Sequence, residues 1–120
     1  MSAARLIFGI AGIYGLVILL PLFFAAPWLM PAPNRPEDYY GFLGVASVMQ
    51  LVYLIIARDP VRFRPLMPVA ALAKAVFFVT ILILWLRGQA AGPAMALASV
   101  DMAIGVAFAF AWLKTPPSAR

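Results

Sequence analysis

Four long apolar stretches fill this chain almost completely, over residues 6–30, 39–57, 66–86 and 94–113. An α-helix rises ~1.5 Å per residue, so about 20 residues are needed to cross a hydrocarbon core ~30 Å thick, and each stretch has this length. Hydrophobic residues make up 66% of the chain and charged residues 11%. Soluble domains are about half apolar and a quarter charged. The sequence therefore predicts an all-α fold in a single integral membrane domain: a four-transmembrane-helix antiparallel bundle.

Proline and glycine mark the connections between the stretches, because both residues interrupt or end helices. They place the four helices at about residues 5–30, 37–58, 66–87 and 93–114. The segment Pro36-Glu37-Asp38 is typical of a helix start, with proline in the first turn and acidic residues at the positive end of the helix dipole. Alternatively, Glu37 and Asp38 form the rim of a site that faces outward. All connections are short, which favours antiparallel neighbours.

The first stretch is too long for the core of a signal peptide, so we interpret it as a spanning helix. It contains Pro21 and Pro27. Each proline removes a backbone donor, which predicts a kink in the outer half of this helix. Such a kink either leaves a cavity or only bends the helix against its neighbours.

The net charge of +5 is explained by membrane topology. If both termini are cytoplasmic, two basic residues, Arg35 and Arg87, face outward, and the others outside the apolar stretches face inward, which agrees with the positive-inside rule. Nucleic-acid binding is therefore not expected. In the inner loop, the guanidinium groups can reach lipid phosphates. These candidates are Arg58, Arg62 and Arg64.

Small residues recur on three of the predicted helices, and such residues let membrane helices approach closely. We interpret them as helix-packing positions, although one stripe could instead contact another chain. The positions are Gly9, Gly12, Gly15, Gly41, Gly44, Ala103, Ala107 and Ala111.

Lys74 and Asp101 are the two charged residues within the apolar stretches, and a charge near the bilayer centre costs ~2.5 to 3.5 kcal/mol on insertion scales. Lys74 lies about 13 Å from the inner edge and Asp101 about 12 Å from the outer edge, at ~1.5 Å per residue. In a core ~30 Å thick their backbones then differ in height by only about 5 Å, which a lysine side chain can span. We expect an interhelical ion pair. The alternative is that Lys74 extends alone to the surface and Asp101 is neutral or bonded to a hydroxyl.

Polar residues on the second predicted helix could extend this pair. Gln50 and Ser47 lie within one arc of that helix, and Asp101 shares a face of the fourth helix with Gly105 and Phe108. The four polar residues Lys74, Asp101, Gln50 and Ser47 form our candidate buried network. Alternatively, Gln50 and Ser47 only hydrogen-bond between helices as packing contacts.

The chain contains no cysteine and no histidine. Thiolate and imidazole metal ligands are therefore absent, as are the Ser-His and Cys-His pairs of nucleophilic catalysis. We predict no metal site, no catalytic residues and no cofactor of the chain's own.

Two segments, YYGFLG at residues 39–44 and RDPVRFRPLM at residues 58–67, look like small bacterial integral membrane proteins. In length and in its four spans the chain is similar to the DoxX-like group of four-helix proteins, some of which accompany membrane oxidoreductases. This resemblance implies a bacterial inner membrane, and a redox role in which a partner supplies the cofactor.

Three functions follow as hypotheses. The preferred one is an accessory or structural subunit of a larger membrane complex, with the lipid bilayer and other membrane chains as partners. The second is a small-molecule or lipid-binding carrier with a pocket around Lys74 and Asp101, lined also by the kinked first helix and by Tyr14, Tyr53 and Gln50. The third is a DoxX-like component of a quinone-linked oxidoreductase, in which tryptophans line the quinone site instead of forming interfacial belts. These tryptophans are Trp28, Trp85 and Trp112.

Overall fold

The computed structural model describes residues 2–29 and 35–117, together with the side chains of 2–24 and 35–117. Its helices are α1 (Ala3–Leu29), α2 (Pro36–Arg58), the short 3-10 helix η1 (Arg64–Leu66), α3 (Met67–Leu86) and α4 (Gly92–Lys114). The described residues contain no strand. The predicted all-α class is confirmed, and the long helices begin and end within two residues of the predicted positions. Pro31, Pro33 and Arg120, and the side chains of Pro27 and Trp28, lie outside the described residues.

The helix ends follow from local sequence. α2 begins at Pro36 with Glu37 and Asp38 in its first turn, and Arg35 forms an exposed ion pair with Asp38 at 2.7 Å. α3 ends at Leu86 and is followed two residues later by Gly88, whose φ of +75° is strained for any residue with a side chain. This conformation lets Gln89 donate its backbone N–H to the Leu84 carbonyl, which closes the last turn.

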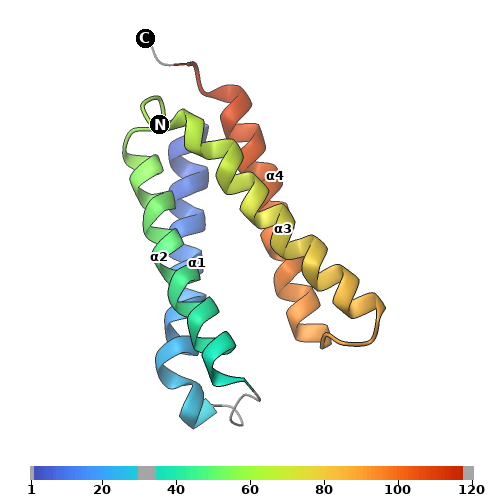
Figure 1. The fold of residues 1–120 in the computed structure, drawn as a ribbon. Helices are drawn as coiled ribbons and strands as arrows, with labels where there is room; N and C mark the ends of the chain where they lie inside the picture. Colours follow the sequence, from blue (N-terminus) through green and yellow to red (C-terminus); the bar gives the residue numbers. More distant parts are fainter. Residues whose placement is uncertain (1, 30–34, 118–120) are drawn as a thin grey trace.

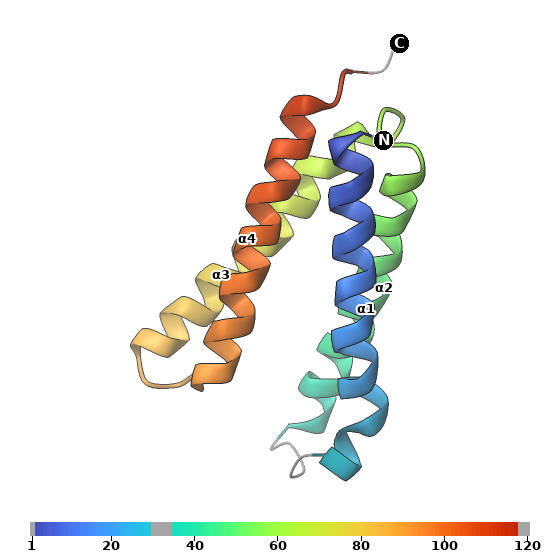
Figure 2. The same cartoon turned by 180° about the vertical axis from the view of Figure 1, so that it is seen from behind.

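Two antiparallel hairpins form the molecule, one from α1 and α2 and the other from α3 and α4. Each helix packs mainly against its hairpin partner, and the hairpins touch chiefly through α1 and α4. They converge at the end where both termini lie and diverge at the opposite end (Figures 1 and 2). α1 continues through Pro21 without interruption, so this proline does not break the helix.

All four helices are long and apolar enough to cross a membrane. Large apolar side chains lie exposed along them, among them Ile10, Leu86 and Leu113, the last two at 70% and 71% exposure. Water would penalise this surface, whereas lipid tails match it. The chain is therefore an integral membrane protein.

Close packing of α1 on α2 depends on some of the predicted glycines. A Cβ atom on Gly12 would approach Leu54 of α2 to 2.8 Å, and one on Gly15 would overlap the Gln50 side chain. Gly9 faces Ala57 at an ordinary contact distance of 3.8 Å. These three glycines form the face on which α2 lies.

The remaining small residues differ in their packing, and a Cβ on Gly44 would meet the Phe23 ring of α1 at 3.6 Å. A methyl group added at Gly41 would meet no atom within 4 Å, and Ala103 is exposed, although Ala111 is fully buried. Each step of four residues turns the helix by about 40° beyond a full turn, so Ala103 and Ala111 lie about 80° apart around α4. The close contact between α3 and α4 lies instead at Gly105, where a Cβ would approach that of Lys74 to 2.8 Å.

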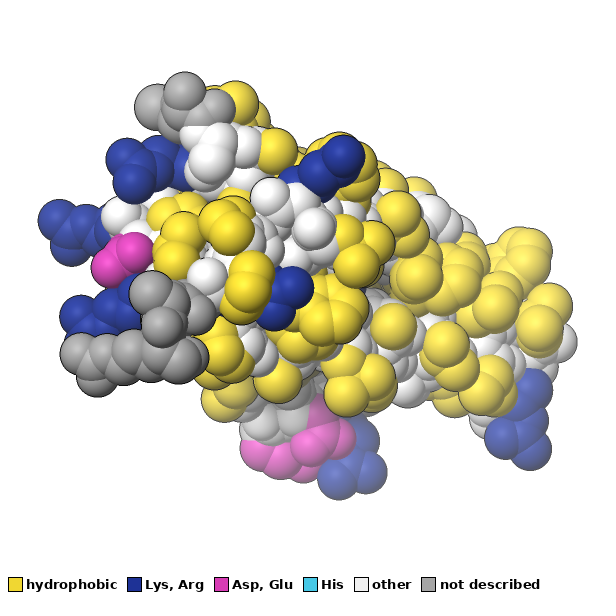
Figure 3. Space-filling view, turned by 90° about the horizontal axis from the view of Figure 1, so that it is seen from above, with side chains coloured by type: hydrophobic (Ala, Val, Ile, Leu, Met, Phe, Trp, Pro, Cys, Tyr) yellow, Lys and Arg dark blue, Asp and Glu magenta, His cyan; other side chains and the backbone are white. Residues whose placement is uncertain are grey.

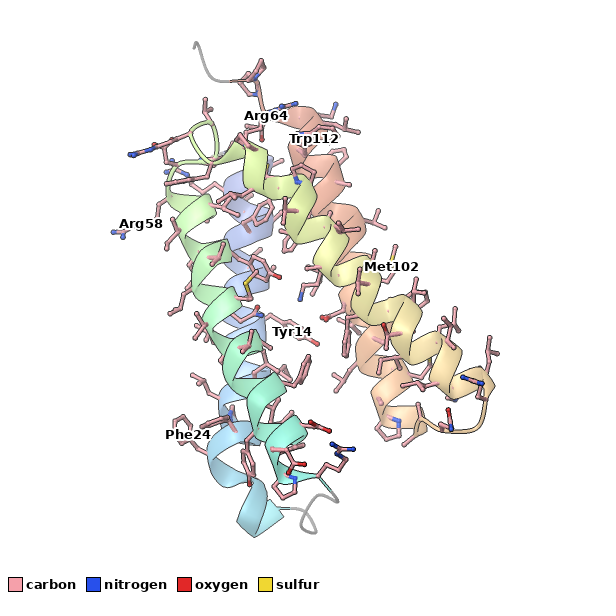
Figure 4. All side chains as sticks on the ribbon, in the orientation of Figure 1. Tyr14, Phe24, Arg58, Arg64, Met102 and Trp112 are labelled. Carbon is pink, nitrogen blue, oxygen red and sulfur yellow. The ribbon has the colours of Figure 1, made fainter. Side chains whose placement is uncertain are left out.

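Basic side chains surround the end at which the hairpins converge (Figure 3). Arg58 and Arg62 are exposed there, as the lipid-phosphate prediction requires. Arg64 differs, because its Nε donates to the Thr115 carbonyl at 2.7 Å and its guanidinium lies 5.2 Å from the centre of the Trp112 ring (Figure 4). Arg64 therefore connects the start of α3 to the end of α4.

Candidate functional site

A cavity of about 410 Å³ lies between the two hairpins, within the range of small-molecule sites of about 300 to 1,000 Å³. All four long helices contribute to its walls, and most of the lining is apolar. The cavity is partly open to the outside of the molecule. Its polar or ionisable lining residues are Tyr14, Gln50, Tyr53, Lys74 and Asp101.

Lys74 and Asp101 meet on the α3–α4 side of this cavity. The Lys74 Nζ lies 3.3 Å from Asp101 Oδ1, and the two side chains are 10% and 26% exposed. Gly105 allows this geometry, since its missing side chain lets α4 approach the stem of Lys74. The ion pair is the arrangement expected from the similar depths of the two residues.

An aromatic cluster fixes the end of the cavity toward the termini. Phe8 of α1 stacks on Phe108 of α4 with ring centres 4.1 Å apart, and Tyr53 of α2 packs at an angle against both. The Lys74 ammonium lies 5.3 Å from the centre of the Tyr53 ring, a distance typical of a cation–π contact. The ion pair is thus anchored to both hairpins.

Gln50 of α2 lines the same cavity but is not bonded to the pair. Its side chain is buried, Nε2 donates to the Ala46 carbonyl at 2.8 Å, and Oε1 has no hydrogen-bond partner. Ser47 donates to the Leu43 carbonyl of its own helix at 2.7 Å and does not line the cavity. The structure therefore brings Lys74 and Asp101 together, places Gln50 on the α2 side of the same cavity, and turns Ser47 back to its own backbone. It does not form the four-residue network.

Sequence reasoning missed two aromatic residues of the site, Phe42 and Phe77. Phe42 of α2 and Phe77 of α3 stack across the gap, with ring centres 5.5 Å apart and an interplanar angle of 13°. Tyr14, which was expected to line the pocket, extends from α1 into the space between the hairpins (Figure 4). Nothing in the spacing of Phe42 and Phe77 links them, because their contact depends on the angle between the hairpins.

The described residues include no group of three His, Cys, Asp or Glu side chains that could hold a metal ion. No family model, curated protein or solved structure matches the chain. The walls of the cavity are apolar over most of their area and carry one ion pair, Lys74 with Asp101.

Proposed function

We propose that the chain is a membrane-embedded binding protein that takes an amphipathic small molecule or lipid from the bilayer into the cavity between its hairpins. The observation that carries this proposal is the position of the Lys74–Asp101 pair in the wall of an otherwise apolar cavity. An apolar pocket with a few convergent polar groups is the usual form of a small-molecule site. Ionisable groups inside membrane segments are costly and mark functional sites.

A cavity-filling substitution tests this function. Ala73 of α3 lines the cavity, whereas Val76 on the same helix is 56% exposed and lies outside it. We expect Ala73→Phe to lose both a lipid that co-purifies with the wild-type protein and the thermal stabilisation that added amphiphiles give. Val76→Phe, the matched control, keeps both. Mass spectrometry of the purified protein and melting curves in detergent provide the measurements, and equal binding by the two variants would contradict the proposal.

A second function is favoured by the packing between hairpins. Because they touch chiefly through α1 and α4, apolar surface of α2 and α3 has no helix against it within the described chain. An accessory subunit of a larger membrane complex would cover such surface with helices of a partner or of a second copy. Purification in mild detergent should then recover a partner at fixed stoichiometry, and recovery of a lone monomer would count against this function.

The membrane in which the protein lies, and its orientation there, are also part of the proposal. We infer a bacterial inner membrane with both termini in the cytoplasm, supported by the basic residues around the converging end of the hairpins. The redox role implied by the DoxX-like resemblance stays a prediction.

A further inference from the structure

The Asp101 carboxylate has an acceptor oxygen that the protein does not use. Its Oδ1 accepts from the Lys74 ammonium at 3.3 Å, and Oδ2 has no hydrogen-bond partner among the described residues. In that part of the chain, Gln50 Oε1 is the one fully buried side-chain polar atom without a partner, so Asp101 Oδ2 keeps accessible surface. The Asp101 side chain is 26% exposed and lines the cavity. A carboxylate accepts several hydrogen bonds, so a bound molecule can donate a further one to this group.

The ion pair lies toward the end of the cavity that the aromatic cluster fixes. The Lys74 ammonium is 5.3 Å from the centre of the Tyr53 ring, which belongs to that cluster. Phe42 precedes Tyr53 on α2 and lies about 16 Å farther toward the divergent end of the hairpins, at ~1.5 Å per residue. The lining between these positions is mostly apolar. A bound amphiphile therefore places its polar group beside Asp101 and its apolar part along the wall toward the divergent end.

The ion pair also restricts the charge of that polar group. Lys74 and Asp101 neutralise one another at 3.3 Å. A cationic group beside Asp101 would place two cations against one carboxylate, and an anionic group would be repelled by the carboxylate that it contacts. Either arrangement leaves an uncompensated charge in a site of low dielectric, which is strongly unfavourable. An uncharged group with an O–H or N–H donor avoids this penalty.

We propose that the cavity binds an uncharged amphiphile through a hydroxyl or amide group that donates a hydrogen bond to the Asp101 carboxylate. Lys74 remains on Oδ1, so the ion pair is kept when the ligand binds. The new bond is charge-assisted, and such bonds are roughly twice as strong as those between neutral groups. Phospholipids, whose head groups carry an anionic phosphate, do not meet these requirements. This inference rests on the proposed binding function and specifies its ligand class.

Four probes with the same oleyl chain test the inference on wild-type protein. Oleyl alcohol is uncharged and has a donor; oleyl methyl ether is uncharged and has none; oleyl sulfate is anionic; oleyltrimethylammonium is cationic. Thermal stabilisation at equal mole fraction in detergent, and adducts in native mass spectra, measure binding. We expect the alcohol to bind about tenfold more tightly than each of the other three, since only the alcohol donates to the carboxylate without adding a charge.

A double substitution removes the acceptor without leaving one charge unpaired. Lys74→Met with Asp101→Leu replaces both members of the pair by apolar residues of similar size, which protein interiors often tolerate. This variant should bind the alcohol and the ether equally. The control is Ser99→Ala, which removes an exposed hydroxyl of α4 that is bonded to its own helix and does not line the cavity. The control should keep the tenfold preference for the alcohol.

The outcomes distinguish this inference from the function beneath it. If wild-type protein binds the ether as well as the alcohol, or prefers a charged probe, the inference is wrong and the binding function stands. If the double variant keeps the preference for the alcohol, another acceptor of the cavity, such as the Tyr53 hydroxyl, receives the bond, and the inference is again wrong. If no probe distinguishes wild type from Ala73→Phe, the binding function itself fails. Should the double variant not fold, the comparison of alcohol with ether on the wild type still decides.

Discussion

Among single residues, Lys74 and Asp101 are the charged groups within the apolar stretches, and burying them costs free energy. Each charge alone at such depth costs ~2.5 to 3.5 kcal/mol on insertion scales. Their contact at 3.3 Å, with Lys74 also over the Tyr53 ring, offsets part of that cost. Removing one partner leaves the other charge buried without a counter-charge, which lowers stability. Replacing both by apolar residues leaves an apolar contact between α3 and α4, which costs little.

This asymmetry gives a double-mutant prediction. Lys74→Met and Asp101→Leu should each destabilise the protein by about 3 to 5 kcal/mol, the usual effect of an uncompensated buried charge. The double variant should recover most of that loss. Melting curves in detergent provide the measurement, with the exposed Arg62→Met as a control that stays near wild type. Additive losses in the double variant would show that the two charges do not interact.

Between helices, the glycines of α1 set how closely α2 can lie. Gly12 and Gly15 are buried against Leu54 and Gln50, and Tyr39 donates its hydroxyl to the Leu22 carbonyl at 3.1 Å near the far end of the same hairpin. The α1–α2 hairpin is thus held by close backbone approach along its length and by a hydrogen bond near its end.

A pair of glycine substitutions tests this packing. Gly15→Ala introduces a methyl group into the space of the Gln50 side chain, and overpacking of this kind costs about 1 to 3 kcal/mol. Gly41→Ala meets nothing within 4 Å and should be neutral or stabilising by up to about 1 kcal/mol, since alanine favours helix. Chemical or thermal unfolding in mixed micelles compares them. Equal stability of the two variants would argue against close approach at Gly15.

The sequence was sufficient to predict where the long helices begin and end and how deep Lys74 and Asp101 lie in the membrane. Pro36, Gly88 and Gly92 mark helix ends that depend on local backbone chemistry, and helix rise alone puts Lys74 close enough in height to Asp101 for its side chain to reach it. It was insufficient to predict which side chains make contact between the two hairpins. The bond of Ser47 to its own helix competes with any bond across the bundle, and the Phe42–Phe77 stack depends on a crossing angle set by many side chains together.

At the scale of the whole molecule, the shape is set by the two hairpins, which are in contact near one end and separate toward the other. They share the aromatic cluster of Phe8, Tyr53 and Phe108 near one end and the Phe42–Phe77 stack across the cavity, and they separate beyond it (Figures 1 and 2). Since the chain has no native cysteine, paired cysteines can measure this separation directly.

We expect the double variant Phe42→Cys with Phe77→Cys to form a cross-link with a short thiol-reactive bridge in native membranes, because these rings are in contact. Phe24→Cys with Leu86→Cys should not react, since Phe24 points away from the second hairpin and Leu86 lies at the divergent tip of α3 (Figure 4). Mobility on denaturing gels reports the product. A cross-link in the second pair would mean that the two hairpins approach one another in the bilayer.

Because the two hairpins are in contact near one end and apart at the other, the protein occupies unequal cross-sectional areas in the two leaflets. Acyl chains that fill the space between the hairpins have protein on both flanks, so they exchange with bulk lipid more slowly than chains around the outer perimeter. The leaflet at the open end must also accommodate the larger footprint, and this area imbalance favours regions where the bilayer is already bent.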